Sequence, residues 1–463
     1  MRVPQNKQQR AAVRIEELDK QYVWHPFTQM RDWEEEPQLV IERGNGSFLV
    51  DTRGRRYLDG VSSLWVTVHG HRKKELDDAV RQQLGKIAHS TLLGLSNVPA
   101  ALLAEKLVGI APRGLAKVFY SDSGSTAVEI ALKIAFQYWQ QKGPRFRRKT
   151  GFLSLREAYH GDTLGSVSVG GIDLFHRIYR PLLFATRKIE SPFCYRCAFG
   201  RTRPSCGMAC LKDAEQVIRK HASRTAGLII EPLVQGAAGM IAHPRGFLRG
   251  IRELCTKHGI LLIADEVATG FGRTGTMFAC EQEKVSPDLM AVAKGITGGY
   301  LPLAATLATE EIYRGFLGEY REFRTFFHGH TYTGNPLASA AAIANIDLFR
   351  KERTLSRLRP KIAFLTKGLK RFRKLAHVGD VRQKGFMVGI ELVRDRRTKA
   401  PYDPAEKVGI RVTRAARRKG LIIRPLGNVI VLMPPLAIAR KELGMLLEIA
   451  YDSIREVTEG SRD

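Results

Sequence analysis

Short apolar runs alternate with stretches of helical periodicity between about residues 100 and 310 of this chain. Strands that are buried on both faces read as such runs, and helices between them favour parallel crossover connections. The pattern therefore predicts an α/β fold in which helices cover both faces of a mostly parallel sheet. The runs lie at residues 117–120, 151–155, 227–230 and 260–264.

The two ends of the chain follow a different pattern. Short strand-like pieces separated by turns fill residues 15–60, and apolar spacing predicts a helix over 75–87. Beyond residue 333 we expect a long helix over 336–350 and then strands near 387–392, 421–423 and 429–432. We divide the chain into an N-terminal segment that joins a small domain and the rim of the site, a large domain, and a C-terminal small domain. Their bounds are 1–75, 76–340 and 341–463.

The composition is that of a globular protein, since 44% of the 463 residues are hydrophobic. No stretch reaches the roughly 18 apolar residues of a membrane span, and residues 1–14 lack the apolar core of a secretory signal. We therefore expect a cytosolic protein without a membrane partner. The net charge of +28 leaves a basic nucleic-acid-binding protein as a remote alternative. The basic residues are spread along the chain, however, and no nucleic-acid-binding signature is present.

Four cysteines are close together in an excursion over residues 191–211 of the large domain. Their spacing is C-x2-C-x8-C-x3-C, and three interpretations stay open: zinc held by thiolates, disulfides, or reduced thiols without a metal. A cytosolic location favours reduced thiols over disulfides. The four are Cys194, Cys197, Cys206 and Cys210.

Asp265 and Lys294 carry the strongest chemical signal. Asp265 ends the apolar run 260–264 and opens a glycine-containing segment, which is typical of the carboxyl end of a buried strand, where α/β sheets place ligands. Lys294 has apolar and glycine neighbours, so partial loss of solvation would lower its pKa and make its amine nucleophilic. An amine and a carboxylate of this kind suit pyridoxal phosphate, whose aldehyde and pyridine nitrogen they would hold.

A second segment, over residues 121–129, follows a predicted strand and opens a helix. Gly124 and Ser125 at a helix N-terminus would form a phosphate site from backbone N–H groups and a hydroxyl. Thr126 and Glu129 fit the spacing of a capping box.

Three more polar positions follow strands or precede a helix. Tyr159 comes after the run 151–155 and could stack on a flat ring, or be a buried tyrosine. Glu231 ends the run 227–230 and could face a crevice, or cap a turn. Residues 327–336 combine glycine, hydroxyls and imidazoles before a helix, and could hold a phosphate or a metal.

In this order and spacing, these segments resemble the class III pyridoxal-phosphate aminotransferases of fold type I over nearly the whole chain. The resemblance implies a large domain with a mostly parallel, seven-stranded type of sheet between helices, and a smaller α/β domain from both chain ends. It also implies pyridoxal 5'-phosphate as cofactor and a homodimer with shared active sites. The segments that carry it are 24–30, 59–65, 159–163, 265–275 and 424–427.

The resemblance implies roles for single residues. Lys294 would bind the aldehyde and carry the proton, Asp265 would pair with the pyridine nitrogen, and Tyr159 would be the third catalytic residue. The cofactor would be held by Gly124, Ser125, Tyr159, Glu231, Asp265, Val267, Lys294 and the partner subunit's Thr331. The substrates would contact Trp65, Phe27, Arg273, Gly329 and Arg424, with Arg424 pairing with a carboxylate.

Segments 24–30 and 59–65 are most similar to the branch that aminates 8-amino-7-oxononanoate to 7,8-diaminononanoate in biotin biosynthesis. Its usual donor is S-adenosylmethionine. The better-known form of this branch has different, aromatic residues at the positions of Phe27, Leu64 and Val431. This chain therefore offers less stacking surface for the adenine group of S-adenosylmethionine. For this reason L-lysine is the alternative donor. Another class III transaminase, acting on ω-amino acids or diamines, is the alternative function.

Overall fold

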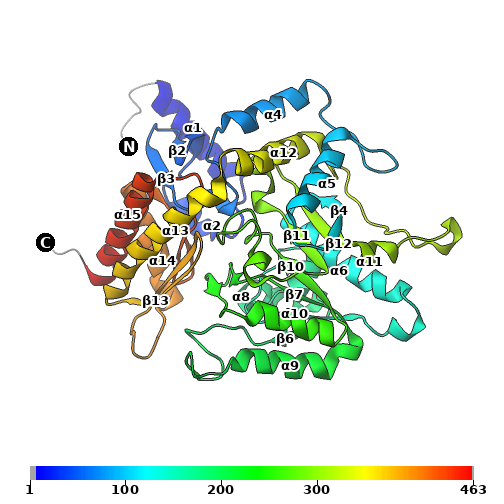
Figure 1. The fold of residues 1–463 in the computed structure, drawn as a ribbon. Helices are drawn as coiled ribbons and strands as arrows, with labels where there is room; N and C mark the ends of the chain where they lie inside the picture. The colour runs from blue at the N-terminus through cyan, green and yellow to red at the C-terminus, as the bar shows by residue number, and fades with distance from the viewer. Residues whose placement is uncertain (1–6, 461–463) are drawn as a thin grey trace.

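A seven-stranded sheet forms the centre of the larger part of the molecule (Figure 1). The computed structural model describes residues 7–460. β12 runs antiparallel to both of its neighbours, and the remaining pairs are parallel, so the predicted mostly parallel sheet is confirmed. The strand order is β4 (Leu115–Ser121), β12 (Ala304–Thr309), β11 (Leu289–Val292), β10 (Leu261–Asp265), β7 (Thr225–Ile230), β5 (Gly151–Leu155) and β6 (Arg187–Ile189).

Helices cover both faces of this sheet because its central strands are apolar on both sides. Every residue of β7 and of β10 is buried. Along β7, Leu228 and Ile230 belong to one hydrophobic cluster, which includes α10 (Phe247–Lys257), whereas Ile229 belongs to a second cluster with α6 (Gly124–Gln141). The sheet is therefore covered by helices on both faces.

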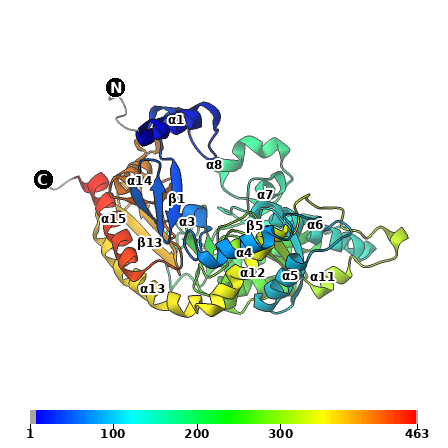
Figure 2. The ribbon, with the colours of Figure 1, turned by 90° about the horizontal axis from the view of Figure 1, so that it is seen from above.

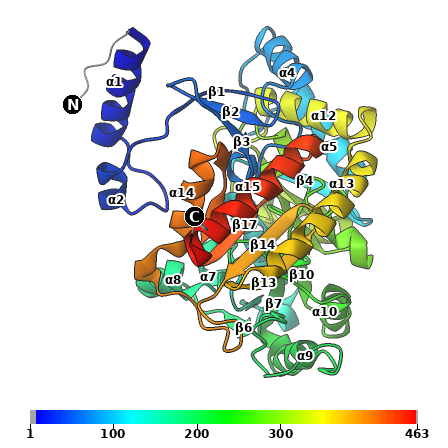
Figure 3. The same ribbon diagram turned by 90° about the vertical axis from the view of Figure 1, so that its left-hand side faces the viewer.

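Both ends of the chain build the smaller part. Its sheet β13 (Val378–Lys384), β14 (Met387–Leu392), β17 (Val429–Leu432), β16 (Arg424–Leu426) lies behind α13 (Thr354–Leu369) and α15 (Arg440–Glu459) in Figure 3. A second sheet joins β1 (Ile41–Asn45), β2 (Phe48–Asp51) and β3 (Arg56–Asp59) to β15 (Leu421–Ile422). Leu58 of β3 pairs in parallel with Leu421, which confirms a small domain from both chain ends.

The three-part division of the chain stays a prediction. Residue 340 falls inside α12 (Pro336–Lys351), which packs on α4 (Lys74–Leu84) and α5 (Val98–Ile110) and leads towards α13 (Figure 2). The expected lack of a secretory signal partly concerns residues 1–6, which lie outside the described residues. Within residues 7–460, no helix is both long enough and apolar enough to cross a membrane.

Candidate active site

A cavity of about 740 Å³ opens at the carboxyl ends of β5, β7, β10 and β11. This is the edge at which parallel sheets bind ligands. Eight of the predicted site residues line it, although they come from distant parts of the chain. They are Trp65, Gly124, Ser125, Tyr159, Glu231, Asp265, Val267 and Lys294.

Lys294 begins a short 3-10 helix, Lys294–Thr297, directly after β11. Burial lowers the pKa of its ammonium group, and the nearby carboxylates of Asp265 and Glu231 oppose that shift. Its Nζ lies 5.5 Å from the centre of the Trp65 ring. A lysine whose pKa is lowered holds more of its amine in the neutral, nucleophilic form.

Asp265 is the last residue of β10 and is 4% exposed. Its Oδ2 lies 2.7 Å from His160 Nδ1, and its Oδ1 accepts a hydrogen bond from the backbone N–H of Val267 at 3.1 Å. These two contacts fix the direction in which the carboxylate points. No feature of the sequence around His160 indicates this pairing, although His160 follows Tyr159 directly.

Glu231 is a buried carboxylate beside this pair. Its two oxygens accept hydrogen bonds from the backbone N–H groups of Tyr159 at 3.1 Å and of Gly236 at 2.8 Å. Burial, and then the charge of Asp265, raise the pKa of Glu231 to about 8. Burial also raises the pKa of Tyr159, whose hydroxyl donates to Asp162 Oδ2 at 2.7 Å.

The N-terminus of α6 forms one wall of the cavity. Ser123 caps this helix: its Oγ accepts from the Thr126 N–H at 3.3 Å, and Thr126 Oγ1 accepts from the Ser123 N–H at 3.0 Å. The predicted capping box of Thr126 with Glu129 is therefore wrong, because the cap is formed one turn earlier. A Cβ added at Gly124 would lie 2.5 Å from Val267 Cγ1, so only glycine lets the helix end approach so closely.

Five predicted residues are not part of the lining of this cavity: Phe27, Arg273, Gly329, Thr331 and Arg424. Phe27 is 59% exposed, and its ring lies 5.5 Å from the ring of Phe175. Gly329 and Thr331 are exposed as well. The segment that carries them is held at the rim, because His330 Nδ1 lies 2.9 Å from Oδ2 of Asp122, which lines the cavity.

Arg273 differs from its predicted role. It is 1% exposed and does not border the cavity. Its guanidinium donates to Ser62 Oγ at 3.1 Å, to the Pro434 carbonyl at 2.9 Å and to the Thr67 carbonyl at 2.8 Å. Burial lowers its pKa to about 10. In this position the side chain joins the segment after β3 to the segment after β17, and it is not free to face a substrate.

Arg424, on β16, is a half-buried cation whose side chain has no hydrogen bond or ion pair with any residue in the range 7–460. Burial lowers its pKa, and Tyr159 is the group whose charge opposes that shift. A guanidinium in such a position is suited to an anion, and its planar donors match a carboxylate.

The four clustered cysteines line a separate cavity of about 20 Å³. All four are free thiols, as are the buried Cys255 and Cys280. Among residues 7–460, no three histidine, cysteine or acidic side chains come together in a way that could hold a metal ion. The interpretation of these four cysteines stays a prediction.

The fold and this site define a class of protein. The profile of the class-III aminotransferases matches residues 29–454, and the chain belongs to this family. Pyridoxal phosphate is the cofactor of the family, and the cavity fits it: an amine of lowered pKa, a carboxylate of fixed direction and an open helix N-terminus face the same space.

Two similar proteins carry the same name. A curated relative from Geobacter sulfurreducens, adenosylmethionine-8-amino-7-oxononanoate aminotransferase, is 56% identical over 447 residues, which cover 96% of this chain and 98% of the relative. The crystal structure of the enzyme of that name from Methanocaldococcus jannaschii has a TM-score of 0.92 and 47% identity, covering 96% of this chain and 99% of its own.

A third similar structure is an amine transaminase from an uncultivated Pseudomonas species in a PLP-bound form. It has a TM-score of 0.90 and 39% identity, and the match covers 94% of this chain and 99% of that one.

Proposed function

We propose that this protein transfers an amino group to 8-amino-7-oxononanoate and forms 7,8-diaminononanoate, a step of biotin biosynthesis. The observation that carries this proposal is Arg424, a half-buried guanidinium near Tyr159 of the cavity wall that has no hydrogen bond or ion pair within residues 7–460. An acceptor with a carboxylate far from its reacting carbon would use both the cavity and this cation. The names of the relatives from Geobacter and Methanocaldococcus support the same acceptor.

Different residues of the cavity would bind different groups of the cofactor. Lys294 would bind its aldehyde, Asp265 would keep its pyridine nitrogen protonated, and Gly124 with Ser125 would hold its phosphate. Val267 and Tyr159 would lie against the two faces of the ring, and Glu231 at its edge. When bound, pyridoxal phosphate supplies the electron sink that makes the α-proton of an amino compound removable.

The chain's own residues then move and guide the proton. Lys294 Nζ would take the proton from the donor's α-carbon and deliver it to the carbon of the former aldehyde group, and in the second half-reaction it would carry a proton in the reverse direction, to the acceptor's carbon. Burial lowers its pKa, so more of the amine is in the neutral, basic form. His160 holds Asp265 in one orientation throughout. Trp65, which is 6% exposed, covers the lysine and limits the access of water.

The amino donor we propose is S-adenosylmethionine, with L-lysine as the alternative. A second candidate function is the amination of other ketones with ω-amino acids or diamines as donors. The likeness to an amine transaminase at 39% identity favours this second candidate, because the two chains share the fold over nearly their whole length.

We also propose a cytosolic homodimer in which the partner subunit's Thr331 completes the phosphate site. Thr331 is exposed in its own chain, as expected for a residue that acts across an interface. The neighbouring Tyr332 and Phe327 are 62% and 73% exposed, and Leu93 is 90% exposed. These side chains lie on adjoining segments, since His89 and Tyr332 have ring centres 4.8 Å apart. Burial of this apolar surface would stabilise a dimer.

The test is a half-reaction followed by absorbance. The enzyme, saturated with pyridoxal phosphate, is mixed with S-adenosylmethionine and, separately, with L-lysine. The lysine-bound cofactor gives a yellow absorbance band, and loss of this band with one of the two compounds identifies the donor. Recovery of the band on addition of 8-amino-7-oxononanoate establishes the acceptor. If only ω-amino acids or diamines bleach the band, the acceptor assignment fails and the second candidate function replaces it.

A further inference from the structure

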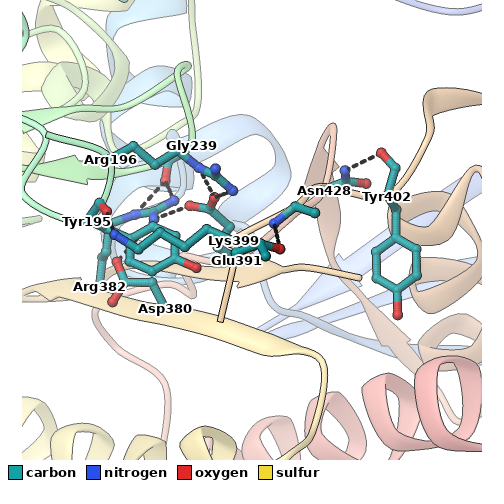
Figure 4. A network of polar contacts seen from close by, with 11 residues as sticks. Tyr195, Arg196, Gly239, Asp380, Arg382, Glu391, Lys399, Tyr402 and Asn428 are labelled. Atoms are coloured by element: carbon teal, nitrogen blue, oxygen red, sulfur yellow. Dashed lines mark hydrogen bonds and ion pairs between the residues drawn. The ribbon is translucent and has the colours of Figure 1, made fainter. Parts of the chain in front are cut away.

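The cysteine-containing excursion of the large domain is attached to the small-domain sheet by polar contacts (Figure 4). Arg196 donates to Glu391 Oε1 of β14 at 2.7 Å, and Lys399 donates to the Tyr195 carbonyl at 2.7 Å. A Cβ added at Gly379 of β13 would lie only 2.3 Å from the Tyr195 hydroxyl. The two segments therefore pack in direct contact. The two parts of the molecule are therefore in fixed contact here.

Arg382 of β13 lies at the centre of these contacts and is 7% exposed. Its guanidinium pairs with Glu391 and with Asp380 Oδ2 at 3.1 Å, and it donates to the Gly239 carbonyl at 2.7 and 3.2 Å. Together with Arg196, the cluster holds two cations and two carboxylates. Buried charges of this kind are tolerated only when they are paired in such a closed arrangement.

The carbonyl that Arg382 binds belongs to a turn over residues 236–239 that forms part of the active-site wall. Ala237 lines the cavity, and the Gly236 N–H donates to Glu231. A Cβ on Gly236 would lie 3.4 Å from the Trp65 ring. A shift of this turn would therefore change the surroundings of Glu231 and Trp65.

On its other side, Arg382 holds the sheet that carries Arg424. Glu391 of β14 pairs with Val429 of β17, and Val431 of β17 pairs with Arg424 of β16. The spacing between Arg424 and the cavity is thus set where this sheet meets the turn 236–239.

We propose that Arg382, through Glu391 and the Gly239 carbonyl, is a positioning residue that sets the distance between Arg424 and the cavity, and with it the selectivity for a carboxylate-bearing acceptor. This inference rests on the proposed function, in which Arg424 binds the acceptor's carboxylate. Arg382 touches neither the cavity lining nor any predicted ligand group. It acts by keeping the turn over residues 236–239 and the sheet that carries Arg424 at a fixed distance from each other.

The test compares 8-amino-7-oxononanoate with its methyl ester, which lacks the negative charge, as acceptors of the holoenzyme. The wild-type enzyme should have a KM for the ester about tenfold above that for the acid. Arg382→Lys, which cannot make the same set of hydrogen bonds, should raise the KM for the acid about tenfold and remove the discrimination, with the KM for the ester unchanged. Glu391→Gln should raise the KM for the acid as well, by a smaller factor. It provides a second test of the proposal if Arg382→Lys fails to fold.

Two further variants separate the possible failures. Arg394→Lys changes an exposed ion pair with Glu406 on the same domain and should leave both KM values unchanged. Arg424→Gln, which removes the cation, should lose the discrimination, and adding Arg382→Lys to it should have little further effect, because one residue acts through the other. A wild-type enzyme that does not prefer the acid contradicts the proposed function. Discrimination that is lost in Arg424→Gln but kept in both Arg382→Lys and Glu391→Gln overturns the positioning role alone.

Discussion

The contact between the N-terminus of α6 and Val267 makes Gly124→Ala an informative perturbation. The new Cβ would lie 2.5 Å from Val267 Cγ1 and 3.1 Å from Cγ2. Because carbon atoms normally pack about 3.5–4.0 Å apart, one of the two walls must move by roughly 1 Å. Overpacking of this size costs about 1–3 kcal/mol of unfolding free energy. The same displacement should lower kcat/KM about 10- to 100-fold, since it shifts the proposed phosphate site relative to the rest of the cavity.

The assay measures cofactor retention by absorbance, the rate of the donor half-reaction, and the thermal midpoint of the holoenzyme. Val267→Ala, combined with Gly124→Ala, removes both clashing methyl groups and should recover most of the loss, a coupling that two unrelated effects would not show. Gly109→Ala is the matched control. It adds the same methyl group near the end of α5, where nothing lies within 4 Å, and should be neutral or stabilising by up to about 1 kcal/mol. Wild-type activity of Gly124→Ala, or a double variant no better than the single one, would refute the reasoning.

Three other predictions follow from the buried groups. The pKa of Glu231 is about 8 in the folded protein, against an ordinary value of 4.5. Between these values only the folded state keeps the proton, so stability falls as the pH rises through this window. Glu231→Gln should remove this part of the pH dependence of the unfolding free energy, measured by urea unfolding of the cofactor-free protein. An equal pH dependence in the wild type and the variant would contradict the assignment. Lys294→Ala should not develop the yellow absorbance band of the lysine-bound cofactor, and its transamination rate should fall at least about 10³-fold. Its thermal midpoint should not fall, because the substitution removes a poorly solvated amine. A retained band would rule out the proposed role of Lys294. Burial raises the pKa of Cys255 to about 12, and the Cys280 thiol is also buried, so a thiol reagent should reach both only after unfolding, whereas Cys194 is exposed and should react in the native protein. Rapid labelling of all six thiols would contradict the packing.

The sheet and the main pair of the site could be predicted because their signals are local. An apolar run that stops at a carboxylate marks the end of a buried strand, and the structure confirms Asp265 at the end of β10. Parallel strands bring such ends together, so Asp265 and Lys294 line the same cavity. β14 coincides with its predicted run, 387–392, for the same reason.

Other features depended on contacts between distant residues. His160 bonds to Asp265 across the sheet, and nothing beside either residue indicates the pairing. The family resemblance implied a place for Arg273 at the substrates, yet its acceptors come from residues 62–67 and from Pro434. An arginine that binds carbonyls cannot be told from one that binds a ligand when only its sequence neighbours are known.

The pairing of β3 with β15 has a consequence for the synthesis of the protein. The Leu58 N–H donates to the Gly420 carbonyl at 2.8 Å, and the Gly60 N–H donates to the Ile422 carbonyl at 2.9 Å. A ribosome makes β3 early and its partner strand near the end, so this edge stays open until almost the whole chain has been translated. Trp65 follows β3 closely and covers Lys294. A chain cut before Gly420 would therefore keep most of its large sheet but lack a fixed cover over Lys294.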